Sequence, residues 1–147
     1  MSTNEAGSTG ESDLLTLIAQ MAPSLDDQVW AFVSIDQVSS EYVAEHALAT
    51  FREAEGTTLI VPWERAEEFD VCSEPMARIT LSVHSSLEAV GLTAAVSRVL
   101  ANDGISANMI AAYYHDHVFV PQALADRAMN CLHGLSRAGN SFDPRAC

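Results

Sequence analysis

The stretch Ile79–Pro121 constrains the fold most, because it passes from one secondary-structure pattern to another without interruption. It opens with ITLSVH, in which apolar and polar residues alternate as they do in a strand with one apolar face. Further along, the apolar residues between Leu92 and Leu100 fall on one face of a helix. The sequence NDG that follows at 102–104 is typical of a helix end. The pattern therefore predicts a strand, a loop and a helix.

Two strands are expected after this helix. The apolar run Ile105–Tyr114 predicts the first, His115-Asp116 a short turn, and His117–Val120 the returning strand. Pro121 suits the first turn of a second helix, because the N–H that proline lacks has no partner there. The whole stretch thus predicts the order β-α-β-β-α, which belongs to the α+β class.

The first half of the chain predicts a similar mixture of elements. Ser12 is a suitable N-cap for a helix that Pro23 ends. A second helix is expected at Glu45–Glu55, with Ala47, Leu48 and Phe51 facing inward and Gly56 at its end. The remaining expected elements are a buried strand at Val29–Ile35, a strand at Thr57–Val61 and a charged loop or short helix at Glu64–Asp70.

Four segments carry a resemblance to a known family: FREAEGTTLIVP, HSSLEAVGLTAAVS, GISAN and YYHDHVFVP. They resemble the ACT domain, a small regulatory fold that binds amino acids, and more narrowly the small bacterial paired-ACT proteins, most of which are uncharacterised. The resemblance covers Leu14–Leu135. It implies a ferredoxin-like sandwich of two ACT-like lobes, whose antiparallel sheets are covered by helices. Many ACT domains place Asp-x-Pro directly before the glycine of the ligand loop, whereas this chain has Ser86–Val90 there.

The expected organisation is a disordered tail at 1–11, an abbreviated ACT-like lobe at 12–72, an ACT domain at 73–136 and a flexible C-terminal tail at 137–147. A complete ferredoxin-like unit needs a fourth strand after its second helix, but Gly134–Cys147 contains no strand signal. We expect a strand of the first half, such as Thr57–Val61, or the same element of a second molecule to cover that sheet edge. A homodimer is the expected assembly.

The charge excludes several classes of function. Seven basic residues against twenty acidic ones give a net charge of −13, so clustered cations for contacts with nucleic acid phosphates are missing. All seven basic residues are arginines, so no lysine can form a Schiff base or anchor pyridoxal phosphate, and no GxGxxG sequence occurs. We therefore expect a protein without catalytic activity and without a cofactor.

The location is predicted from what the sequence lacks. No apolar run approaches the ~20 residues that span a bilayer, and the N-terminal residues lack the basic region and apolar core of a signal peptide. Cys72, Cys131 and Cys147 are odd in number and form no CxxC pair, which favours reduced thiols over disulfides or a zinc site. We expect a cytoplasmic protein that binds neither membranes nor nucleic acid.

The loop between the strand and the helix of the second half is the candidate ligand site. Unpaired N–H groups at a helix start favour a carboxylate, and the resemblance implies an amino acid as ligand. The expected ligand-binding residues are His84, Ser85, Ser86, Leu87, Val90, Gly91 and Leu92 of this loop, with Ser106 and Asn108 at the start of the neighbouring strand. Two structural alternatives stay open here. Ser85 and Glu88 fit a capping box that satisfies the same N–H groups, and Gly91 could serve helix packing or a bend.

Two other functions also stay open. His115 and His117 point to the same face of a strand, and with His84 they would supply three imidazoles to zinc, as in a metal-dependent enzyme. A structural protein-interaction module is the third interpretation. The function we favour is a non-catalytic, amino-acid-responsive regulatory protein. Its ligand would tighten an interface between lobes or subunits and so change contacts with a regulated partner protein.

Overall fold

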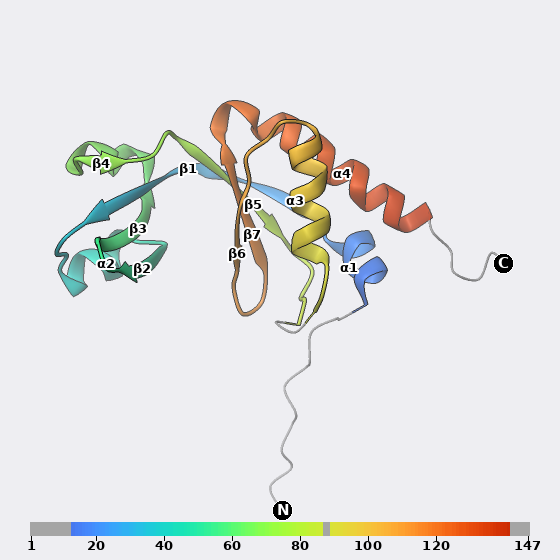
Figure 1. Cartoon of the computed structure of the whole chain (residues 1–147), viewed down its shortest axis with the longest axis horizontal. Helices are drawn as coiled ribbons and strands as arrows, with labels where there is room; N and C mark the ends of the chain where they lie inside the picture. The colour runs from blue at the N-terminus through green and yellow to red at the C-terminus, as the bar shows by residue number, and fades with distance from the viewer. Residues whose placement is uncertain (1–12, 87–88, 142–147) are drawn as a thin grey trace, which may run out of the picture.

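A single long strand joins the two lobes of this molecule (Figure 1). The computed structural model describes residues 13–86 and 89–141. The helices are α1 (Leu14–Gln20), α2 (Ser40–His46), α3 (Leu92–Asn102) and α4 (Ala125–Ser141), with short 3-10 helices η1 (Trp63–Glu68) and η2 (Gln122–Leu124). The strands are β1 (Pro23–Ile35), β2 (Ala49–Glu53), β3 (Gly56–Pro62), β4 (Val71–Cys72), β5 (Met76–Leu81), β6 (Asn108–Ala111) and β7 (Asp116–Pro121).

All strand pairs are antiparallel and follow the order β2-β3-β1-β5-β7-β6, with β4 also pairing with β1. The C-terminal part of β1, from Trp30 to Ile35, pairs with β3. Its N-terminal part, from Pro23 to Trp30, pairs with β5. Each part of β1 therefore belongs to a different ferredoxin-like unit, which confirms the predicted α+β class and ACT-like sandwich.

The fourth strand of the second unit is the beginning of β1. It pairs with β5 from Pro23↔Leu81 to Trp30↔Met76, so it covers the edge that the sequence left open. The prediction that a strand of the first half would cover this edge is therefore confirmed, but the strand we named, Thr57–Val61, was wrong, because β3 pairs with the other end of β1. Helix α1 also packs in the core of the second unit. The lobes therefore interleave along the chain, and the predicted boundary between 72 and 73 does not separate their contacts.

The first half contains the clearest error of the sequence analysis. The helix predicted at Glu45–Glu55 is instead the end of α2 followed by strand β2. Phe51, expected inward, is 70% exposed and lies opposite Thr58 in a hairpin. Gly56 does not end a helix. It begins β3 at the β2–β3 hairpin, with a φ of +151°. The strand expected at Thr57–Val61 is confirmed within β3, and the charged segment forms η1.

The second half follows the predicted order of elements, with shifted boundaries. Helix α3 is confirmed, and Gly104 with φ +72° follows its end. Strand β6 is shorter than expected, and the hairpin turn lies at Tyr113-Tyr114, closed by the bond from the Ala112 N–H to the His115 carbonyl. The turn predicted at His115-Asp116 was therefore wrong, because Asp116 already pairs with Leu81 in β7.

The ends of the chain differ from the prediction in two details. Helix α1 is capped by Asp13, whose carboxylate accepts a bond from the Thr16 N–H, whereas Ser12, the predicted cap, lies outside the described residues. Helix α4 continues to Ser141, so residues 137–141 are helical although we expected a flexible tail there. The expected tail at 1–11 and residues 142–147 also lie outside the described residues.

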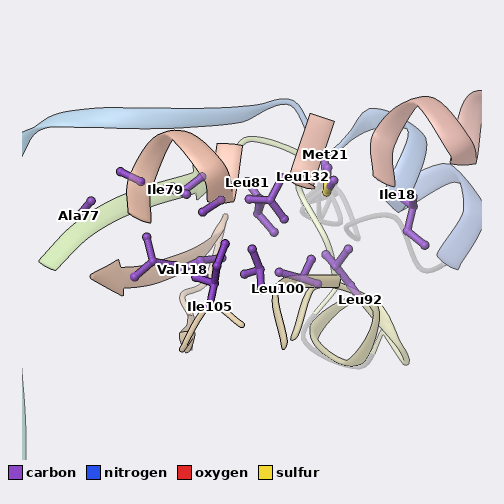
Figure 2. Close-up of a cluster of buried hydrophobic side chains, with 14 of the residues drawn as sticks. Ile18, Met21, Ala77, Ile79, Leu81, Leu92, Leu100, Ile105, Val118 and Leu132 are labelled. Atoms are coloured by element: carbon purple, nitrogen blue, oxygen red, sulfur yellow. The ribbon is translucent and has the colours of Figure 1, made fainter. Parts of the chain in front are cut away.

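Two cores lie under the helices and a third lies on the opposite face of the sheet. The largest packs α1, α3 and α4 on β5 and β7, with Ile79, Leu100 and Val118 fully buried (Figure 2). A smaller core lies under α2 and η1 in the first lobe. The third cluster comes entirely from strands of both lobes and joins Ile60, Met76 and Phe119. We call this side of the sheet the helix-free face.

Candidate functional site

A cavity of about 130 Å³ opens where β5 ends and α3 begins. We call it the loop cavity. The loop after β5, the first turn of α3 and the open ends of β6 and β7 all contribute to its walls. Its lining residues are Ser85, Ser86, Ala89, Gly91, Leu92, Thr93, Ala111 and Asp116.

Asp116 brings a buried carboxylate to this cavity. It is 7% exposed, and the Ser85 hydroxyl donates to its Oδ2 across 3.5 Å, the limit for a hydrogen bond. Burial raises the pKa of the Asp116 carboxyl, while the Ser85 hydrogen bond and the nearby His117 and His115 act in the opposite direction. The contacts of Asp116 therefore offset only part of the cost of burying its charge, and a cation in the cavity would stabilise the charged form.

Another part of the cavity wall is the N-terminus of α3. Its N-cap is Gly91, which has no side chain to cap the helix. The first intrahelical bond runs from the Ala95 N–H to the Gly91 carbonyl, so the N–H groups of Leu92 to Ala94 have no acceptor within the helix. Such N–H groups and the helix dipole attract an anion.

The structure explains why position 91 is a glycine, a question for which the sequence offered two structural answers. Its φ is +104°, which side chains rarely adopt, and a Cβ there would lie 2.9 Å from Cδ2 of Leu14 in α1. The positive φ is the stronger reason for glycine, because the contacted atom is the end of a flexible leucine side chain that can move. Both the bend and the packing on α1 therefore account for Gly91, which by itself does not indicate a ligand.

The structure gathers four of the nine expected site residues in the loop cavity: Ser85, Ser86, Gly91 and Leu92. His84 does not line it, and its ring lies 5.5 Å from that of Tyr114. Val90 is 82% exposed and does not line the cavity. Leu87 lies outside the described residues.

Ser106 and Asn108 lie away from the loop cavity. Asn108 begins β6 opposite Phe119, whereas the cavity is lined by Ala111 at the other end of that strand. Within one lobe β6 runs parallel to β5, so the start of β6 and the end of β5 lie at opposite ends of the sheet. Including these two residues in the site was therefore wrong for this lobe.

The capping box expected at Ser85 and Glu88 does not open helix α3. The helix begins at Leu92, several residues later, and Ser85 instead forms an isolated bridge and bonds Asp116. Glu88 lies outside the described residues. The N–H groups of the first turn are therefore not satisfied by Ser85.

The sequence analysis missed Asp116 as a site residue because it placed this residue in a turn. The strand alternation contained the signal. Asp116, Val118 and Val120 share one face of β7, and the two valines are fully buried in the large core. An acidic residue that continues a buried apolar face is unusual enough to mark a functional position.

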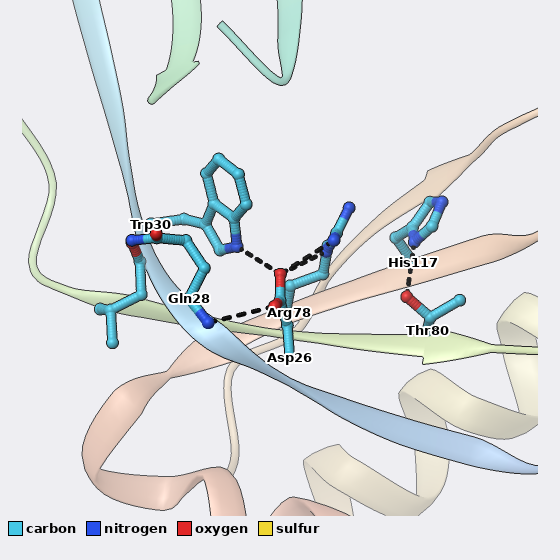
Figure 3. A network of polar contacts seen from close by, with 7 residues as sticks. Asp26, Gln28, Trp30, Arg78, Thr80 and His117 are labelled. Carbon is cyan, nitrogen blue, oxygen red and sulfur yellow. Dashed lines mark hydrogen bonds and ion pairs between the residues drawn. The ribbon is translucent and has the colours of Figure 1, made fainter. Parts of the chain in front are cut away.

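The three histidines of the metal hypothesis are not arranged as a ligand set. His117 lies on the helix-free face, where its Nδ1 is 3.0 Å from the Thr80 hydroxyl (Figure 3). Its pKa is lowered by burial and by the nearby Arg78 and His115, with Asp116 opposing the shift. His115 keeps a buried Nδ1 without a hydrogen-bond partner among the described residues. In residues 13–86 and 89–141 no group of three or more metal-ligating side chains could hold an ion.

A polar network holds β1 where it passes between the lobes (Figure 3). The register of β1 against β5 shifts between Leu25 and Val29, and Asp26 lies in this irregularity. Its Oδ2 accepts bonds from Trp30 Nε1 at 2.9 Å and from Arg78 Nε at 3.1 Å, with Arg78 Nη2 at 2.8 Å. Burial opposes the charge on Asp26, but these bonds and that from the Gln28 N–H leave its pKa below the ordinary value.

Sequence comparison identifies the family. Models of the ACT domain match residues 9–78 and 77–134, one after the other. The chain belongs to the ACT-domain family. The paired arrangement predicted from the sequence is thereby confirmed, and membership of the ACT family supports a regulatory, ligand-binding role. No curated protein matches the sequence.

Solved structures agree with this assignment. A Vibrio cholerae protein of unknown function, described as a "possible transport protein", is 43% identical with a TM-score of 0.74, covering 84% of this chain and 95% of that one. A protein from Agrobacterium tumefaciens has a TM-score of 0.62 at 11% identity, covering 74% of this chain and 84% of that one. The regulatory subunit of aspartate kinase from Thermus flavus has a TM-score of 0.59 at 12% identity, covering 80% and 98%. At such low identity the last two are similar in fold alone. Among the described helices of our protein, none has the length and apolar character needed to cross a membrane.

Proposed function

We propose that this ACT protein is a non-catalytic regulator that binds a small amino acid in the loop cavity. The observation that supports the proposal most strongly is that a helix N-terminus and a buried carboxylate line the same cavity. The N–H groups at the start of α3 suit the carboxylate of an amino acid, and the buried Asp116 suits its ammonium group. A free amino acid carries both groups, whereas a simple anion or cation would leave one wall unpaired.

The volume of the loop cavity narrows the ligand class. About 130 Å³ corresponds to roughly four water molecules at about 30 Å³ each, well below the range of drug-sized pockets. A small amino acid fits this space, while a large side chain would require the loop after β5 to move. The apolar Ala89, Leu92 and Ala111 are available to a short aliphatic side chain.

The proposed mechanism is a population shift. A ligand held between the β5–α3 loop and the start of β7 stabilises the closed arrangement of these elements by its difference in affinity for the closed and open states. Because β7 also contributes Phe119 to the cluster shared by the lobes, closure would be transmitted to the interlobe contacts and then to a partner protein. We propose a homodimer, since β2 and β6 each end the sheet with one edge unpaired among the described strands. A cytoplasmic location remains part of the proposal and rests on the sequence alone.

The test is a thermal unfolding scan with each of the twenty amino acids. Ligand at about 100 times its dissociation constant stabilises the native state by about 2.7 kcal/mol, which such a scan resolves. We expect a selective rise with one or a few small amino acids. No rise with any amino acid would contradict the proposal and favour a structural interaction module.

Two variants locate the response. Asp116→Asn should abolish it, because the ligand's ammonium group loses its carboxylate partner. Asp126→Asn, a matched change at an exposed position of α4, should leave it intact. Equal responses in the two variants would place the ligand elsewhere. Sedimentation at micromolar concentration checks the dimer, and a monomer with or without ligand would contradict that part of the proposal.

A further inference from the structure

A second and larger cavity lies between the two lobes, away from the loop cavity. Its volume is about 440 Å³, within the range of small-molecule sites. We call it the interlobe cavity. Its lining residues are Phe32, Ala49, Thr50, Phe51, Glu53, Thr58 and Ile60 from β1, β2 and β3, and Met109 and Ile110 from β6.

The interlobe cavity lies where the two edges of the sheet approach each other. Strands β2 and β6 stand at opposite ends of the strand order, yet both line this one space. Both faces of each strand contribute: Ala49 and Ile110 belong to the helix-free face, whereas their neighbours Thr50 and Met109 point to the other face. The cavity therefore follows the strand edges and contacts both lobes at once.

The wall of the interlobe cavity is mostly apolar. Phe32 and Ile60 form part of the shared cluster, in which the Phe32 ring meets the Phe119 ring edge-on at 5.2 Å. Phe51 at the cavity is 70% exposed, a large aromatic surface that a bound apolar group would remove from water. An apolar ligand body, aromatic for preference, suits this lining.

The polar groups of the wall favour a positively charged ligand. Glu53 is the one charged residue among those lining the cavity, and its carboxylate accepts a hydrogen bond from the Thr58 hydroxyl, which also lines the space. The chain contains no lysine, and none of its arginines within the described residues lines the cavity. A cationic group is therefore attracted, whereas a carboxylate would be desolvated without a donor of opposite charge.

We propose that the interlobe cavity binds a small molecule that joins an apolar, preferably aromatic, body to a single amino group. Such a ligand stacks against Phe51 and directs its ammonium to Glu53. It differs from the amino acid proposed for the loop cavity, because a second, negatively charged group has no partner in the interlobe cavity. Since the ligand contacts β2 and β3 on one side and β6 on the other, it stabilises one relative arrangement of the lobes.

The test compares three probes with the same aromatic ring: phenethylamine, 3-phenylpropionate and phenylalanine. Isothermal titration and thermal unfolding are measured on the full chain. We expect phenethylamine to bind and to raise the unfolding temperature, and 3-phenylpropionate to do neither. Phenylalanine should bind more weakly than phenethylamine, because its carboxylate has no partner in the cavity; phenylalanine binding as tightly as the amine would contradict the proposal. Equal binding of the amine and the acid would overturn the proposal, as would the absence of amine binding.

Matched variants place the amine in the interlobe cavity. Glu53→Gln should weaken phenethylamine about two- to fivefold, as for an exposed ion pair, while Glu55→Gln should leave it unchanged. Phe51→Ala should weaken it further, with Tyr113→Ala, at 69% exposure against 70%, as the control outside the cavity. If both members of each pair bind the amine equally, the proposed site is wrong.

A filling variant gives a separate check. Ala49→Trp should remove amine binding by occupying the space, and an unchanged thermal unfolding transition would show that the fold is kept. If Ala49→Trp instead dissociates a dimer and the unchanged protein binds no amine, a second copy of the chain covers the cavity and the proposal is overturned. Asp116→Asn should leave amine binding unchanged, so failure of the loop-cavity proposal does not affect this one.

Discussion

Phe119→Ala is the substitution that best tests how the lobes are joined. Phe119 lies in β7 and is 1% exposed, yet its contacts belong to the strand-built cluster on the helix-free face. Its ring meets Phe32 of β1 edge-on, with centroids 5.2 Å apart, and it packs with Ile60 of β3 and Met76 of β5. Truncation at this position therefore removes contacts with strands of both lobes.

The expected loss in the free energy of unfolding is large. Truncating a buried phenylalanine to alanine costs about 3–5 kcal/mol, of which the aromatic pair contributes about 0.5–1.5 kcal/mol. Domains of ordinary size have a total stability of about 5–15 kcal/mol, so the variant would lose a substantial part of it. At about 2–4 °C for each kcal/mol, the unfolding temperature should fall by about 6–20 °C.

Urea unfolding followed by far-UV and aromatic signals measures this loss. The matched control is Phe51→Ala, because Phe51 is 70% exposed and its truncation should change stability by no more than about 0.5 kcal/mol. We expect Phe119→Ala to unfold in one transition at lower urea. A loss below about 1 kcal/mol, or equal effects of the two substitutions, would show that the lobes are not joined through this cluster.

Three further predictions concern single groups. Asp116→Asn should unfold at higher temperature than the unchanged protein at neutral pH. Because burial raises the pKa of Asp116, the stability that it contributes is fully present below its ordinary value of 3.8 and is lost as the pH rises through its pKa in the folded protein. The gain should therefore shrink on acidification, and a pH-independent gain in thermal midpoint would contradict this. Gly91→Ala should lower the free energy of unfolding in urea more than Gly104→Ala does. Both glycines have positive φ, but of the two only Gly91 would bring a Cβ within 4 Å of a neighbour, 2.9 Å from Cδ2 of Leu14. Equal losses would contradict packing of Gly91 on α1. Asp26→Asn should cost about 1.5–3 kcal/mol in the same assay, as expected for hydrogen bonds to a charged group, and a neutral effect would show that the network does not hold β1.

The second half of the fold could be predicted from sequence because its local signals agree with its packing. The apolar residues of α3 at Leu92, Val96 and Leu100 are the ones that are buried, and Gly104 follows the helix as its pattern predicted. The local pattern and the tertiary contacts favour the same structure in this half, so the periodicity of apolar residues was sufficient to predict its helix and strands.

The prediction for the first half of the chain was wrong where pairing of an edge strand overrides a helical pattern. Ala47, Leu48 and Phe51 have helical spacing, but pairing of Ala49–Glu53 with β3 gives those residues backbone partners and leaves Phe51 exposed. Spacing alone does not distinguish an inward-facing aromatic residue from one that lines an open cavity between lobes. Pairing of the start of β1 with β5 also depends on long-range contacts, which no local pattern in Pro23–Val29 indicates.

The candidate site was predicted in part for the same reason. The loop from Ser85 to Leu92 follows directly from the local change of period, and four of the site residues predicted in it line the loop cavity. Asp116 reaches the cavity only through the register of β7 against β5, where it lies opposite Leu81. Placing the hairpin turn two residues too late, at His115-Asp116 in place of Tyr113-Tyr114, was therefore enough to assign the buried carboxylate to solvent.

An NMR titration of the ¹⁵N-labelled protein with pools of the twenty amino acids tests the central claim most directly. The account predicts that one amino acid shifts the amide signals of Leu92, Thr93 and Asp116, at the two charged walls of the loop cavity, and that Asp116→Asn removes the shifts. Unchanged amide signals at these residues with every pool, or shifts that persist in Asp116→Asn, would contradict it.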